Sequence, residues 1–228
     1  MRISGKEKSN SGFSLIELII VIAIMGVLTG ILAPTFIKYV EKSKKAKDVY
    51  TAAQIARAVN IAFVENPEAY EAFQKWGVDS DPKYKNPPTA SKAAVTVKGT
   101  YLADPVWVVA SSGTQSSGNT KSNCFNGTAA AFNGGDKYGN LGFYGVVNRE
   151  LGLSTTKMNS SIVPKYTQKK EGSATSDMNG KPYQNLDRWR ICKRKDNGAM
   201  EIWVAQPDPW GGYPVYRLWP EPDDFYTQ

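Results

Sequence analysis

A long apolar run near the N-terminus constrains this chain more than any other feature of its sequence. The run reads GFSLIELIIVIAIMGVLTGILAPTF from Gly12, and between Phe13 and Ile37 it carries a single charged side chain, Glu17. As a helix that rises about 1.5 Å per residue, the run would extend about 37 Å, enough to cross a hydrocarbon layer of about 30 Å. We therefore expect a transmembrane helix over residues 13–37.

Two simple interpretations of the run explain less of it. A secretory signal peptide has an apolar core of about 7–15 residues, and the small residues before Pro34 make a poor cleavage site. A plain membrane anchor leaves Glu17 unexplained, because a carboxylate within hydrocarbon costs about 2.5–3.5 kcal/mol even on the lenient insertion scale. The sequence therefore marks Glu17 as a functional residue that needs a cation nearby.

Glu17 is part of a longer pattern. Residues 12–18 read Gly-Phe-Ser-Leu-Ile-Glu-Leu, the apolar sequence IIVIAI follows them, and a short basic leader precedes them. This pattern resembles the class III signal of type IV prepilins and type II secretion pseudopilins. The resemblance implies a single-pass precursor in the cytoplasmic membrane, with its leader inside and its head outside, that later becomes part of an extracellular surface filament.

The same resemblance implies roles for single residues. A prepilin peptidase would cut between Gly12 and Phe13 and methylate the new amine of Phe13, since a bulky side chain at position 12 would block the cut. Glu17 would then pair with the N-terminal amine of a neighbouring subunit, which neutralises two charges inside an apolar filament core. The implied partners are further subunits of the filament, the prepilin peptidase, an inner-membrane assembly platform and membrane lipid.

Three helix-weakening residues lie inside the apolar run. Gly26, Gly30 and Pro34 recur every four residues and so share one helix face, and two glycines at this spacing allow close helix approach. Pro34 has no N–H for the carbonyl of Gly30. The resemblance implies that the segment can lose helical form in a filament, and an ordinary kinked anchor is the alternative.

Residues 38–65 contain neither glycine nor proline and predict an amphipathic continuation of the helix. Apolar side chains recur there at helical spacing, which predicts a face for packing against a sheet: Val49, Ala52, Ala53, Ala56, Val59 and Phe63. The lysines at the start of this segment predict a solvated surface near lipid headgroups, and a role on the filament surface or in binding DNA is the alternative.

The remaining residues, 66–228, read as a globular β-rich head. β-branched and aromatic residues predict strands at 94–102 and 106–110, and alternation on both sides of Asp196-Asn197-Gly198 predicts a hairpin. We therefore expect an α+β, pilin-like fold in which the long N-terminal helix, transmembrane in its first half, packs on an antiparallel sheet. The expected divisions are a removed leader (1–12), a membrane and filament-core helix (13–37), an amphipathic helix (38–65) and the head (66–228).

The absence of histidine limits the chemistry of the chain, because it excludes Ser-His-Asp and Cys-His catalysis and every histidine metal site. We therefore expect no enzyme, no metal and no cofactor. Calcium is the one alternative, since oxygens of Glu221, Asp223 and Asp224 follow a segment that loosely resembles one of major pseudopilins, though without EF-hand spacing.

The two cysteines, Cys124 and Cys192, are expected to share an extracytoplasmic compartment, in which a disulfide can persist. We predict a bridge between them. The alternative is a strand cysteine in the core and a free loop cysteine.

Two functions fit these features. The first is a structural subunit of a type IV pilus or pseudopilus. The second is a minor or tip pilin whose head binds a surface, a glycan or DNA, since tryptophan faces stack on sugars and bases. The candidates are Trp107, Trp189, Trp203, Trp210 and Trp219, although packing within strands is the alternative for most of them.

Overall fold

The structure is a computed structural model, and it forms two compact units, Met1–Glu41 and Lys42–Gln228. It describes residues 13–76, 94–97, 100–103, 106–112, 125–126, 142–153, 162–166, 186, 188–205 and 214–227. Gly12 and Cys124, two residues to which the sequence analysis gives roles, lie outside these ranges.

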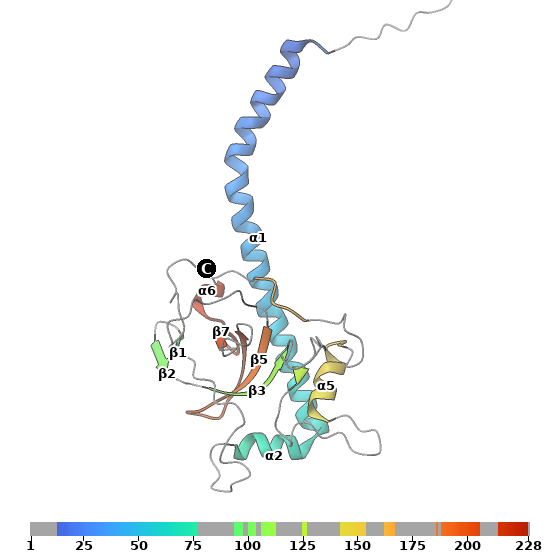
Figure 1. Cartoon of the computed structure of the whole chain (residues 1–228), viewed down its shortest axis with the longest axis vertical. Coiled ribbons are helices and arrows are strands. Elements are labelled where there is room, and N and C mark those ends of the chain that lie inside the picture. The colour runs from blue at the N-terminus through green and yellow to red at the C-terminus, as the bar shows by residue number, and fades with distance from the viewer. Residues whose placement is uncertain are drawn as a thin grey trace, which may run out of the picture. The chain divides into compact units, whose positions relative to one another are not determined.

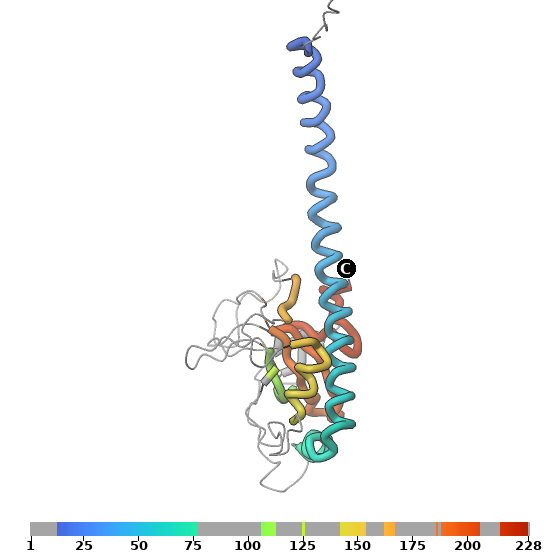
Figure 2. Tube along the Cα trace, turned by 90° about the vertical axis from the view of Figure 1, so that its right-hand side faces the viewer, coloured from blue at the N-terminus to red at the C-terminus, as the bar shows by residue number. Residues whose placement is uncertain are grey.

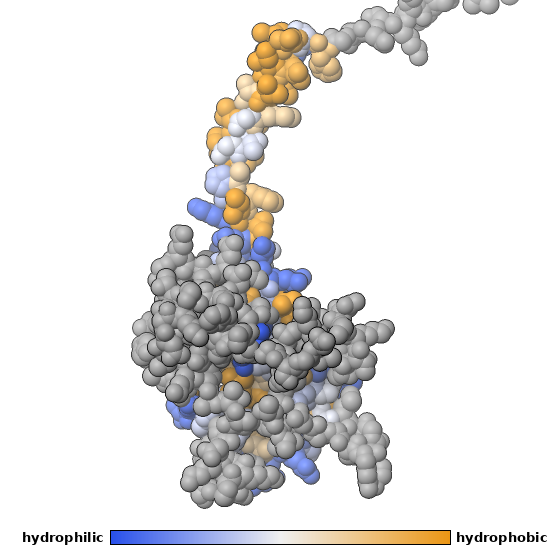
Figure 3. All heavy atoms as spheres, in the orientation of Figure 1, coloured by the Kyte–Doolittle hydropathy of each residue, from blue (hydrophilic) through white to orange (hydrophobic). Residues whose placement is uncertain are grey.

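The predicted N-terminal helix is α1, Leu15–Glu65, which runs continuously through Pro34 (Figure 1). It is long and apolar enough in its first part to cross a membrane. The side chains from Leu15 to Ile37 are all exposed and are mostly hydrophobic (Figure 3). Burial of α1 begins at Asp48, so the two parts of this helix meet different surroundings.

An antiparallel sheet of five strands, in the order β4-β3-β5-β6-β7, forms the centre of the second unit. The strands are β3 (Val106–Ser112), β4 (Phe125–Asn126), β5 (Arg188–Arg194), β6 (Met200–Ala205) and β7 (Pro214–Trp219). β5 and β6 form the predicted hairpin, and Gly198 in its turn has a φ of 71°, a left-handed conformation that glycine adopts without strain.

The stretch predicted as a strand at 94–102 is two strands. β1 (Ala94–Val97) and β2 (Thr100–Ala103) pair antiparallel with each other in a separate two-stranded sheet. β-branched and aromatic residues predict an extended backbone, but they do not show that two short strands within the stretch pair with each other.

Three shorter helices accompany the sheet: α2 (Pro67–Lys75), α5 (Phe143–Glu150) and α6 (Asp224–Thr227). Pro67 begins α2, and the side chain of Asn66, at the N-cap position, makes no capping hydrogen bond to α2. Its Nδ2 instead donates to the carbonyl of Ala62 at 3.0 Å. The carbonyl of Ala62 thus accepts from both the backbone N–H and the side-chain amide of Asn66 at the end of α1.

The second half of α1 packs against the sheet, and this contact forms the core (Figure 2). Ile55 and Val59 of α1 and Ile191 and Ile202 of the sheet are completely buried in one cluster. The predicted α+β, pilin-like class is thereby confirmed. One predicted core residue is wrong, because Ala53 is exposed while its neighbours Ala52 and Ile55 are buried.

A buried lysine fixes α2 against the sheet. Lys193 on β5 is 1% exposed, and its Nζ donates to the carbonyls of Phe73, Gln74 and Trp76 at 2.5, 2.9 and 2.8 Å. These carbonyls end α2, where the helix dipole favours a positive charge. Burial lowers the pKa of Lys193, because it disfavours the charged ammonium group. The hydrogen bonds to the three carbonyls offset part of this cost.

Candidate assembly site

The predicted assembly residue Glu17 lies in the first turn of α1 and contacts the start of its own helix. Its Oε2 accepts a hydrogen bond from the backbone N–H of Ser14 at 2.9 Å. Ser14 precedes the first helical residue, Leu15, and the carbonyl of Ser14 accepts from the N–H of Leu18. Glu17 therefore satisfies one of the backbone donors that a helix start leaves without a partner.

This contact is half of a capping box, a role that the sequence analysis did not assign. The signal was present, because Ser14-Leu-Ile-Glu17 fits the pattern of a serine followed three residues later by a glutamate before an apolar run. The carboxylate also lies next to Phe13, whose side chain is 93% exposed. The one acid of the apolar run and the residue that would carry the new amine are thus close together.

The two glycines of the apolar run leave open space on the helix surface. A Cβ added at Gly26 or at Gly30 would meet no atom within 4 Å apart from its chain neighbours and the adjacent helix backbone. Neither glycine is therefore required by packing within the described chain. Loss of helical form around Pro34 stays a prediction.

A shallow apolar groove of about 510 Å³ lies beside the second half of α1. Ala53, Ile61 and Val64 form part of its lining, and Trp219 from β7 forms another part. Arg57, Asn60 and Glu65 supply polar groups to the same groove. Ala53 is therefore exposed to this groove and not to the core.

Comparison with known proteins bears on the N-terminal segment. Residues 8–33 match the model of the prokaryotic N-terminal methylation motif. This N-terminal segment is therefore similar to the segment at which prokaryotic proteins with this motif are methylated.

The chain is similar to curated proteins that are named as type IV fimbrial or pilin proteins. The chain is 32% identical over 100 residues to a type IV major fimbrial protein FimA of Dichelobacter nodosus, covering 41% of this chain and 64% of that one. It is 47% identical over 58 residues to the type IV major pilin protein PilA of Myxococcus xanthus (strain DK1622), covering 23% and 26%.

A third relative is prepilin peptidase-dependent protein A of Clostridium perfringens, 43% identical over 63 residues that cover 27% of this chain and 44% of the relative. The chain thus spans less than two thirds of the length of these pilin relatives. No solved structure matches it.

The tryptophans proposed for stacking on sugars or bases are mainly structural in the pilin-like head. Trp189 and Trp203 are completely buried, and Trp107 and Trp219 are partly buried. Trp210 lies outside the described residues. The two buried indoles therefore offer no face to a ligand, and their packing is the alternative that the sequence analysis left open.

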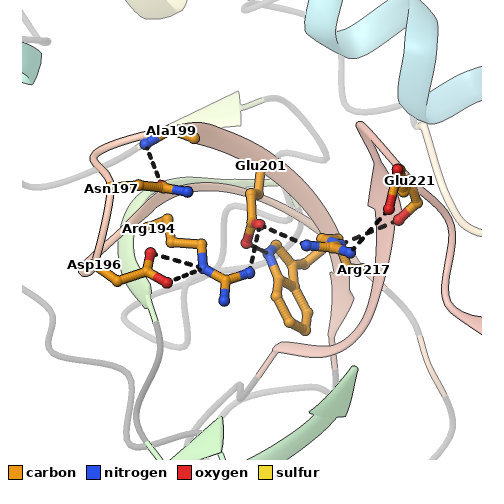
Figure 4. Close-up of polar contacts among 8 residues, drawn as sticks. Arg194, Asp196, Asn197, Ala199, Glu201, Arg217 and Glu221 are labelled. Carbon is orange, nitrogen blue, oxygen red and sulfur yellow. Dashed lines mark hydrogen bonds and ion pairs between the residues drawn. The ribbon is translucent and has the colours of Figure 1, made fainter. Parts of the chain in front are cut away.

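A buried ion network holds Trp203 in place (Figure 4). Glu201, 2% exposed, accepts from Trp203 Nε1 at 3.0 Å, from Arg217 at 3.0 Å and from Arg194 at 3.2 Å. These residues come from β5, β6 and β7, so the network ties three strands together. Removing Glu201 would leave the guanidinium groups of the buried Arg217 and the partly buried Arg194 without this carboxylate.

The structure describes one of the two cysteines of the predicted disulfide. Cys192 is a buried thiol on β5, and burial raises its pKa. It forms no disulfide with another described residue, but its predicted partner Cys124 lies outside the described ranges. The bridge stays a prediction.

The carboxylates considered for calcium have separate local roles. Asp223 is buried, and its Oδ1 accepts from the N–H of Phe225 at 2.9 Å, at the start of α6. Glu221 and Asp224 are exposed. Within the described ranges, no group of three or more His, Cys, Asp or Glu side chains is placed to hold a metal.

A completely buried acid joins α1 to a distant segment. The carboxylate of Asp48 accepts backbone N–H groups of Lys165 at 2.6 Å and of Tyr166 at 2.8 Å. Burial raises its pKa from 3.8 to about 6, although the two hydrogen bonds and the charges of Lys165 and Lys47 act in the opposite direction.

We expect the head to lose stability as pH rises from about 4 to about 7. The folded-state pKa of Asp48 is raised, so the folded state binds this proton more tightly than the unfolded state, and ionisation costs up to about 3 kcal/mol of unfolding free energy. Denaturation of the full chain in detergent, followed by tryptophan fluorescence, measures this slope. The variant Asp48→Asn, whose amide does not ionise, should show a flatter slope, and an unchanged slope would contradict the assignment.

Proposed function

We propose that this chain is a structural subunit of a type IV pilus or related pseudopilus and has no catalytic role. The observation that carries the proposal is the exposed apolar half of α1, which follows a methylation motif and continues into a packed head. An apolar surface of this length must be covered by lipid or by other helices. A filament subunit meets both surroundings, first in the membrane and then in the filament.

We assign a role to each part of the chain. Residues 1–12 are the leader, 13–37 the membrane and filament-core helix, 38–65 its amphipathic continuation and 66–228 the head. The leader faces the cytoplasm and the head lies outside. Prepilin peptidase cuts between Gly12 and Phe13 and methylates Phe13, and the assembly platform then moves the subunit into the filament.

Glu17 carries the charge that sets the register of assembly. In the isolated chain its carboxylate accepts from the N–H of Ser14 and so already lies beside Phe13. A neighbouring subunit brings a cationic amine at its own Phe13, and pairing neutralises both groups inside the apolar core. The open surface at Gly26 and Gly30 and the groove beside Trp219 are surfaces on which neighbouring helices pack.

Mass spectrometry of native material tests this proposal. We expect the chain in sheared surface filaments to begin with a methylated Phe13, and the chain in membranes to be present both with and without residues 1–12. Native material that begins at Met1 and is absent from filaments would overturn the proposal. The abundance of the chain in those filaments separates a major subunit from a minor one.

A further inference from the structure

The lysines that follow the apolar half of α1 differ in their surroundings. The stretch Lys42–Asp48 contains four lysines and one acid. Lys42, Lys44 and Lys47 are exposed, whereas the single acid, Asp48, is completely buried. We call these three exposed lysines the basic collar.

The other two charged residues of this stretch, Asp48 and Lys45, make contacts within the head. Asp48 is held by the N–H groups of Lys165 and Tyr166. Lys45 points toward the head. Its Nζ donates to the carbonyl of Phe225 at 2.7 Å and lies 4.1 Å from the centre of the Phe225 ring. Folding therefore buries the acid and leaves three ammonium groups in solvent.

The lysines of the collar lie on both sides of the buried face of the helix. An α-helix turns about 100° per residue, so Lys44 and Lys47 share one side and Lys42 lies about 200° from Lys44. This distribution presents charge around the helix and not along one groove. A flat surface crossed by the helix meets all three lysines, while a rod-like polymer alongside the helix meets only one side.

The height of the collar above the apolar run matches the headgroup layer of a membrane. Lys42 follows Ile37 by five residues, about 7.5 Å along a helix, and Lys47 follows it by about 15 Å. Headgroups extend about 5–8 Å beyond each side of the hydrocarbon core, and charges act over a Debye length of about 8 Å at physiological salt. Lys42 thus falls among headgroups, and Lys44 and Lys47 fall within reach of their charge.

We propose that the basic collar binds anionic phospholipid headgroups on the membrane face at which the head emerges. This inference rests on the proposed membrane position of residues 13–37. Each lysine near an anionic surface contributes about a fivefold preference for that surface. The collar gives the membrane-bound subunit an annulus enriched in anionic lipid, which the subunit leaves when it enters a filament.

Lipid retention by the full chain tests the proposal. The mature chain is reconstituted in nanodiscs of equal phosphatidylglycerol and phosphatidylethanolamine, and native mass spectrometry counts the lipids that it keeps after release. We expect an excess of phosphatidylglycerol that falls with added salt. Lys42→Gln should reduce this excess about fivefold, and the triple glutamine variant of the collar should remove it.

Two controls separate position from total charge. Arg57→Gln removes a cation from the same helix about 30 Å beyond Ile37, outside the reach of headgroups, and should leave the excess unchanged. The triple Lys→Arg variant of the collar should keep it. An unchanged excess in the triple glutamine variant would overturn the proposal.

Two further outcomes are distinguishable. If the collar variants lose binding to duplex DNA in a gel shift while lipid retention stays constant, the collar recognises nucleic acid and the lipid assignment is wrong. Resistance of the chain to alkaline extraction from membranes reports its insertion separately. A chain that is extracted fails the proposed function, whereas an inserted chain without lipid preference fails only this inference.

Discussion

Replacing Glu17 by glutamine is expected to lower the yield of sheared filaments at least tenfold while the amount of subunit in the membrane stays unchanged. The glutamine can still accept the Ser14 N–H, since glutamine serves at this position of a capping box. It cannot neutralise the amine of a neighbour, and an uncompensated cation in an apolar core costs several kcal/mol, where each 1.4 kcal/mol is a factor of about ten. Shearing and immunoblotting measure both quantities.

Two further variants separate the effect of the helix cap on assembly from the effect of the negative charge at position 17. Glu17→Val removes both and should also fail to assemble without losing membrane insertion. Glu17→Asp keeps the charge on a shorter side chain and should assemble better than Glu17→Gln. A normal filament yield from Glu17→Gln would show that the carboxylate serves only as a helix cap, and the register argument would then be wrong.

Replacing Gly12 by leucine is expected to leave the uncut precursor in the membrane and to abolish filaments. A peptidase that cuts between residues 12 and 13 must admit residue 12 into its site, and a leucine side chain would occupy the space that glycine leaves free. The precursor keeps residues 1–12, including Arg2, Lys6 and Lys8, and migrates more slowly on a gel. Mass spectrometry of the N-terminal peptide measures the cut fraction directly.

The leader offers a matched control for this experiment. Gly5→Leu adds the same side chain seven residues before the expected cut and should be processed normally. Normal processing of Gly12→Leu, or a block by both variants, would contradict cleavage at Gly12.

The N-terminal helix and the central hairpin were predictable from sequence because their signals are local. The apolar run and the absence of glycine and proline over residues 38–65 predict α1, and alternation around Asn197-Gly198 predicts β5 and β6. The methylation motif is also local, so the match over residues 8–33 could be expected from the sequence. The cap made by Glu17 was equally available in the sequence, as the spacing of Ser14 and Glu17, but was not used.

Residues of the head that contact distant segments could not be assigned in this way. Lys193 occupies a position in β5 that predicts only a polar strand residue, and its role follows from the end of α2 lying beside it. Glu201 likewise gains its partner Arg217 through the pairing of β6 with β7. Pairing of this kind brings together residues that are far apart in the chain, and no local pattern records it.

The sequence alone determined that residues 13–37 form an apolar helix with one acid, because length, hydropathy and helical period are properties of a contiguous segment. Only the tertiary structure decided which side of the following helix is buried. It turned Ala53 toward a groove and enclosed Asp48 against Lys165 and Tyr166, which leaves the basic collar exposed. The physical reason is that burial depends on the elements that pack against a helix, and many of those elements are distant in the sequence.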